Sequence, residues 1–157
     1  MSGVYTVPFA ATSLTVAVDL CEVTAHAARP AMIRGFVLAQ KTELGDAQEE
    51  MLRITIKSGQ TTSGSGGSST TPVNKDGQGA AAGFVAEQAN TTKASAGTIV
   101  DHGPWTWNVR SSPLIVMFPE GEEIFLIAGR RATLELVDAP ADSIDIYGHL
   151  VVQEIGS

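Results

Sequence analysis

Three histidines and one cysteine are the residues of this chain that could bind a transition metal. His26, His102 and His149 form no His-x-His or His-x-x-x-His pair, the spacings that bring two imidazoles to one ion. Cys21 is the only cysteine, so neither an intrachain disulfide nor a thiolate metal cluster can form. It follows an expected strand and is predicted to be a small buried side chain. We therefore expect no metal ion and no cofactor.

Carboxylates and serines could bind calcium or perform hydrolysis. The carboxylates gather at two expected turns: Glu120, Glu122 and Glu123 at one, and Asp138, Asp142 and Asp145 at the other. The second, DAPADSID, lacks the alternating ligand positions and the glycine of a calcium loop, so we expect solvated acidic turns. The serines of SGSGG (63–67) lack the strand–turn–helix context of a nucleophile elbow. Carboxylates that meet across a groove, as in a glycosidase, cannot be recognised from sequence spacing. We expect no enzymatic activity.

Two tryptophans in GPWTWNVR are the strongest candidates for a binding surface. Trp105 and Trp107 are two positions apart and would share one face of a strand. Two neighbouring indoles could form a sugar-binding platform or an intersubunit anchor, because tryptophan is enriched at interface hot spots. They could equally fill the core, and the sequence leaves both alternatives open.

The tract GQTTSGSGGSSTTP (59–72) carries no charge and no large side chain. It is not a phosphate-binding loop, because no Gly-Lys followed by Ser or Thr closes it. A linker is disfavoured, because neither half of the chain would make a comfortable domain alone. We expect a long loop over 60–80 that orders against a neighbouring subunit, the alternative being a mobile surface loop without a role. Its candidate contact residues are Thr61, Thr62, Ser63, Ser65, Thr70 and Thr71.

The elements that must position these residues follow a period of two. In MLRITIKSG, RATLELVD and SIDIYGHLVVQEI, apolar residues alternate with polar ones, as in strands with one buried and one wet face. The last of these would place His149 on the solvent side. EEIFLIAGRRATLELV predicts a hairpin that turns near Gly129, and LGDAQEE a short helical turn capped by Asp46. Further strands are expected at 4–9, 14–20, 32–40, 83–90, 105–110, 114–118 and 124–128. The sequence therefore predicts an all-β protein, one antiparallel β-sandwich domain over 1–157 with a jelly-roll-like arrangement.

Composition and charge limit the partners. With 157 residues, 43% hydrophobic and 17% charged, the chain can bury the core of one domain. A net charge of −7 and no basic run beyond Arg130-Arg131 disfavour nucleic acid. No stretch reaches the roughly 20 apolar residues of a membrane helix, and the first 20 residues lack the features of a signal peptide. We expect a protein that contacts neither nucleic acid nor membrane.

Three longer segments carry a resemblance to a known family: GDAQEEMLRITIKSGQTTSGSGGSSTTP, AAAGFVAEQANTTKASAG and DAPADSIDIYGHLVVQEIG. From about Gly45 onward the chain resembles small proteins encoded among the virion structural genes of tailed bacteriophages and prophages; the first forty residues resemble them less distinctly. The resemblance implies a capsid decoration or cement protein, or a minor tail protein, and brings no catalytic residues. It implies a virion assembled in the host cytoplasm, with the major capsid protein as partner and a homotrimer as the oligomer. The rival hypothesis is a tail-associated carbohydrate- or receptor-binding β-sandwich that uses the two tryptophans and the long loop.

Overall fold

The computed structural model describes residues 3–42, 49–111 and 113–156, which contain strands and no helix. The helical turn predicted at 44–50 lies almost entirely outside these residues. No helix that could span a membrane is therefore present in the described ranges. The strands are β1 (Gly3–Leu14), β2 (Asp19–Thr24), β3 (Ala31–Gln40), β4 (Met51–Thr62), β5 (Ser68–Thr70), β6 (Val73–Asn74), β7 (Val85–Asn90), β8 (Ser95–Asp101), β9 (Trp105–Asn108), β10 (Leu114–Met117), β11 (Ile124–Leu126), β12 (Arg131–Leu136) and β13 (Ile144–Glu154).

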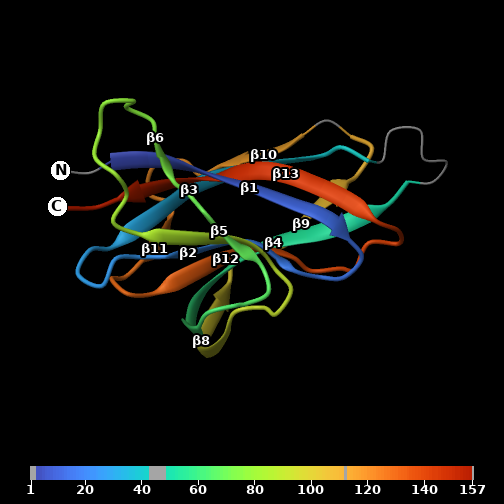
Figure 1. Ribbon diagram of the computed structural model, residues 1–157, viewed down its shortest axis with the longest axis horizontal. Coiled ribbons are helices and arrows are strands. Elements are labelled where there is room, and N and C mark those ends of the chain that lie inside the picture. Colours follow the sequence, from blue (N-terminus) through green and yellow to red (C-terminus); the bar gives the residue numbers. More distant parts are fainter. Residues whose placement is uncertain (1–2, 43–48, 112, 157) are drawn as a thin grey trace.

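The strands form two antiparallel sheets, which we call sheet A and sheet B (Figure 1). Sheet A has the order β10-β3-β13-β1-β6, and β11 extends its β10 edge by pairing with β3. Sheet B has the order β5-β7-β2-β12-β4-β8, and β9 extends its β8 edge by pairing with β4. The predicted all-β sandwich is confirmed.

The core lies between the sheets and is built by the predicted alternation. In β4, Leu52, Ile54 and Ile56 are fully buried, and in β13 the same holds for Ile144 and Ile146. Phe36 and Leu38 of β3, which pairs with β13 in sheet A, are also fully buried and belong to the same core. β12 departs from the pattern, because its polar residues are buried as well as its apolar ones. The outer face of sheet B is therefore covered at β12.

The predicted hairpin at Gly129 is wrong. β11 pairs with β3 in sheet A, whereas β12 pairs with β2 and β4 in sheet B. The turn itself is present, since Arg130 N–H donates to the Ile127 carbonyl over 3.0 Å. Each strand has apolar residues that face the core, β11 from sheet A and β12 from sheet B. The turn therefore carries the chain from one sheet to the other.

Two further strand boundaries differ from prediction. The strand expected at 14–20 is a connection over 15–18 between β1 and β2, and β8 was not predicted. β8 is exposed along its whole length, so it has no alternating burial and no corresponding pattern in its sequence.

The tract over 60–80 differs from the expected long loop. β4 continues to Thr62, β5 pairs with β7 at the edge of sheet B, and β6 pairs with β1 at the edge of sheet A. Thr70 Oγ1 donates to the Pro8 carbonyl over 2.6 Å, which ties β5 to β1. The tract thus joins the two sheets along one side of the sandwich.

A pair of glycines lets β8 lie against β4, where the register shifts between Ser58 and Gln60. Gly59 has φ +93°, and a Cβ there would lie 2.1 Å from the Thr98 carbonyl oxygen. Gly97, with φ +77°, would meet the Gly59 carbonyl oxygen at 2.5 Å. This is the close backbone approach that a glycine at a β-bulge permits.

We expect Gly59→Ala to destabilise the fold much more than Gly121→Ala. Both glycines have a φ near +90°, but nothing lies within 4 Å of a Cβ at Gly121. The control, Gly121→Ala, should lower the free energy of unfolding by about 1 kcal/mol through backbone strain. Gly59→Ala should lower it by about 2 kcal/mol more, because β8 must move. Chemical denaturation measures both, and equal losses would show that the β4–β8 approach does not depend on Gly59.

Candidate functional site

A strap of two segments crosses the outer face of sheet B. The strap consists of residues 63–67, which run from β4 to β5, and residues 91–94, which run from β7 to β8. Each segment must cross between opposite edges of sheet B, past β2 and β12. The two are paired, because Ser65 and Thr92 exchange backbone hydrogen bonds of 2.9 and 3.0 Å. The predicted contact residue Ser65 therefore belongs to the strap.

The Glu22 carboxylate, on β2, holds the first segment of the strap. Its Oε1 accepts from Ser63 Oγ at 2.7 Å, and its Oε2 accepts from the Gly64 N–H at 2.9 Å. Arg131 Nε lies 3.1 Å from Oε1, and Asn90 Nδ2 donates to Oε2 at 3.3 Å. Glu22 is 2% exposed. A buried carboxylate needs this number of partners to offset its loss of hydration.

The second segment of the strap is held by a neighbouring group of charges. Lys93 Nζ lies 2.6 Å from Glu135 Oε1, and Lys57 Nζ lies 3.1 Å from Glu135 Oε2. The Ala94 N–H donates to Asp19 Oδ2 at 2.7 Å. Asp19 Oδ1 is buried and has no hydrogen-bond partner among the described residues. Burial, against the hydrogen bond from Ala94, raises the Asp19 pKa to about 7.

These carboxylates form hydrogen bonds and ion pairs within the chain. Within residues 3–42, 49–111 and 113–156, no group of three His, Cys, Asp or Glu side chains is placed to hold an ion. Cys21 is fully buried, as predicted, and burial raises its pKa above the ordinary range. Most polar atoms beneath the strap are paired within the chain, with Asp19 Oδ1 as the exception described above.

The other predicted contact residues of the tract lie at the end of β4, in the strap and at the end of β5. Thr61 and Thr62 are exposed at the end of β4, and Thr71 is exposed between β5 and β6. Ser63 and Thr70 use their hydroxyls within the chain, as described above. Whether the exposed threonines contact another subunit stays a prediction.

The two tryptophans lie on the inner side of β9. Trp107 is 2% exposed and belongs to the core. Trp105 is half-buried, and its ring packs edge-on against Phe36 at 5.3 Å and tilted against Phe118 at 6.0 Å. The alternative that the tryptophans fill the core is therefore correct for Trp107. Trp105 extends the core to the edge of the sandwich.

The outer face of sheet A carries exposed apolar side chains, which the sequence analysis did not single out. Ile115 and Met117 of β10 are 64% and 49% exposed, and Phe125 of β11 is 53% exposed. Strand pairing places Val37 beside Ile115 and Met32 beside Phe125, both half-buried. We call these five residues the apolar face. The sequence signal was the unbroken apolar run LIVM in β10, which is unusual for a strand with a wet face.

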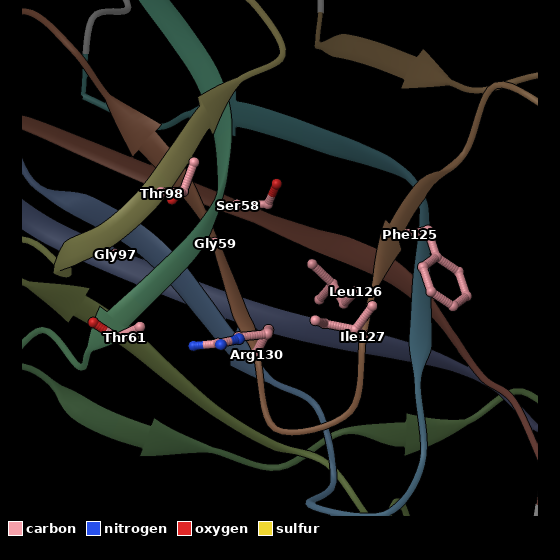
Figure 2. Close-up of a pocket in the computed structure, with 9 residues that line it drawn as sticks. All are labelled: Ser58, Gly59, Thr61, Gly97, Thr98, Phe125, Leu126, Ile127 and Arg130. Carbon is pink, nitrogen blue, oxygen red and sulfur yellow. The ribbon is translucent and has the colours of Figure 1, made fainter.

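A pocket of about 400 Å³ opens at the edge of the sandwich where β11 of sheet A lies opposite β4 and β8 of sheet B. We call it the open-edge pocket. Leu126 and Ile127 form one wall, and the glycine pair of β4 and β8 lies on the other side. Figure 2 shows the Arg130 side chain extending from the turn after β11 in the direction of Thr61. Arg130 forms no ion pair with any described residue.

A serine–histidine contact lies beside this pocket. Ser58 Oγ and His102 Nε2 share a hydrogen bond of 2.8 Å, and Ser58 also lines the pocket. Burial lowers the His102 pKa, although the neighbouring Asp101 carboxylate opposes the change. The Asp101 carboxylate accepts from Thr55 Oγ1 and the Gly103 N–H. Sequence spacing could not reveal the pair, since it joins residues 44 positions apart.

We expect Asp19→Asn to remove a pH dependence of stability. The folded chain keeps the Asp19 proton up to about pH 7, whereas the unfolded chain releases it near pH 3.8. This contribution is therefore complete below about pH 4 and is lost as the pH rises to 7. From pH 4 to 8, the free energy of unfolding of the wild type should fall by about 2–4 kcal/mol relative to the variant. Denaturation across this range measures it, with the exposed Asp142→Asn as control. Parallel curves for wild type and Asp19→Asn would contradict the expectation.

Comparison with known proteins identifies no relative of this chain. No protein-family model, no curated protein and no solved structure matches the chain.

Proposed function

We propose that this protein is a structural component of a tailed-phage virion, a capsid decoration or cement protein. In this proposal it binds the major capsid protein as a homotrimer and stabilises the head by mechanical contacts, without catalysis. The apolar face is the observation that carries the proposal. The segments quoted above, which resemble virion proteins, supply the biological setting.

The apolar face lies where the chain supplies no cover of its own. The strap covers the outer face of sheet B, but no described segment pairs with the free edge of β10. A free, apolar edge strand is an association hazard that proteins normally blunt with charge or cover. Association with other subunits would bury Ile115, Met117 and Phe125 together. A stable assembly of this kind buries on the order of 2,000 Å², and closed symmetry limits its size.

The strand order supports a jelly-roll classification. In sheet A the order is β10-β3-β13-β1, and in sheet B β9 pairs with β4, followed by β12 and β2. Eight strands interleaved in this way between two sheets correspond to two Greek keys. Strands β5 to β8, with the strap, then form one insertion between β4 and β9. Jelly rolls occur in viral capsid and lectin domains, which agrees with both functions considered for this chain.

A second candidate function is carbohydrate or receptor binding at a phage tail. The observation that favours it is the open-edge pocket, with Arg130 beside an apolar wall. The two tryptophans contribute little, because Trp107 is in the core.

We expect Ile115→Asp to dissociate the oligomer while Val85→Asp does not. The two residues are almost equally exposed, at 64% and 63%, but Val85 lies on β7, away from the apolar face. A carboxylate at the centre of a buried apolar contact costs several kcal/mol, so the molar mass from light scattering should fall to that of the monomer. A monomeric wild type, or equal dissociation by both variants, would refute an interface at this face.

The virion assignment is tested by labelling the particles of the phage or prophage that encodes the chain. Gold-labelled antibody spread evenly over the head is the expected result for a decoration protein. Label confined to the tail would favour the second candidate, and absence of label would remove both virion assignments.

A further inference from the structure

Arg130 is a cation without a described acidic partner in a chain of net charge −7. Six ion pairs engage six other basic side chains, and one of them is formed by its neighbour Arg131. The turn 127–130 instead places Arg130 at the open-edge pocket. A guanidinium binds a carboxylate through two parallel N–H···O hydrogen bonds, and it does so best beside an apolar surface where water competes less.

Residues with hydroxyl groups and residues with apolar side chains line the same pocket as this cation. Ser58, Thr61 and Thr98 line the pocket from β4 and β8, and Leu126 and Ile127 line it from the β11 side (Figure 2). The bulge at Gly59 and Gly97 leaves the floor without side chains. Hydroxyl groups on one side and a flat apolar wall on the other match a pyranose ring, whose edges are polar and whose faces carry C–H groups. The volume of about 400 Å³ lies within the range of small-molecule sites.

We propose that the open-edge pocket binds a sugar acid, a hydroxyl-rich ring that carries a carboxylate. The Arg130 guanidinium binds the carboxylate, the hydroxyls of Thr61 and Thr98 bind ring oxygens, and the exposed Ile127 side chain packs against the ring face. The pocket adjoins the apolar face, because Phe125 belongs to both, but ligand binding there does not depend on the virion assignment. It gives a ligand class to the second candidate function and rests on that function only for its biological role.

The test is an amide NMR titration of the full chain with glucuronate, and with glucose as the neutral match. Glucuronate should shift the amides of Gly59, Gly97, Thr98 and Ile127 saturably, whereas glucose should bind at least about tenfold more weakly. Arg130→Gln should weaken glucuronate binding by about tenfold or more, the equivalent of one charge-assisted hydrogen-bonded contact. Arg110→Gln is the control, because Arg110 is also exposed and forms no ion pair with a described residue. The spectrum of each variant reports whether it is folded.

Four results would count against the proposal. If glucuronate shifts none of the pocket amides, or if Arg110→Gln weakens binding as much as Arg130→Gln, the pocket is not a sugar-acid site. If glucose binds as tightly as glucuronate, the acid specificity is wrong while carbohydrate binding as a function survives. Acetate, titrated in parallel, should bind more weakly than glucuronate; equal binding would show that only the carboxylate is recognised and would refute the sugar.

Discussion

The hydrogen bonds to the buried Glu22 carboxylate are the interaction on which the two faces of this molecule depend. Ser63 and Gly64 donate to it from the strap, and Arg131 compensates its charge from the neighbouring strand. These contacts hold 63–67 over sheet B, and the pairing of Ser65 with Thr92 holds 91–94 beside it. A tract of small, uncharged residues suits this position, because a Cβ at Gly64 would lie 2.7 Å from the Thr92 carbonyl oxygen.

The strap makes the two sheets chemically different. Beneath it, sheet B buries polar and charged side chains, most of which pair with one another, although Asp19 Oδ1 has no hydrogen-bond partner among the described residues. Sheet A receives no such cover and presents Ile115, Met117 and Phe125 to the surroundings. The same insertion ends in β8, which forms the open-edge pocket with β11. The chain between β4 and β9 thus covers part of sheet B and contributes β8 to the pocket at the edge of the sandwich.

Local sequence patterns predicted the strands in which apolar and polar residues alternate. They did not predict the regions where burial depends on segments far away in the sequence. Leu52, Ile54 and Ile56 were assigned to one buried face correctly, and Cys21 was correctly expected to be buried. The strap could not be predicted, because Glu22 meets Ser63 across 41 positions and composition alone indicates a flexible tract. The hairpin predicted at Gly129 is wrong because two adjacent apolar strands indicate a turn but do not indicate whether both strands belong to the same sheet. The pocket combines residues of β4, β8 and β11, none of which has a local motif.

In the proposed assembly, sheet A associates through the β10 edge and the apolar face. Amide hydrogen exchange of the wild-type chain, followed by mass spectrometry over a wide dilution series, tests it most directly. We predict that β10 exchanges slowly at high concentration and faster on dilution, whereas β8, the free edge of sheet B, exchanges at the same rate throughout. Exchange of β10 that is independent of concentration while the chain is shown to dissociate would contradict the claim, as would a change in β8 equal to that in β10.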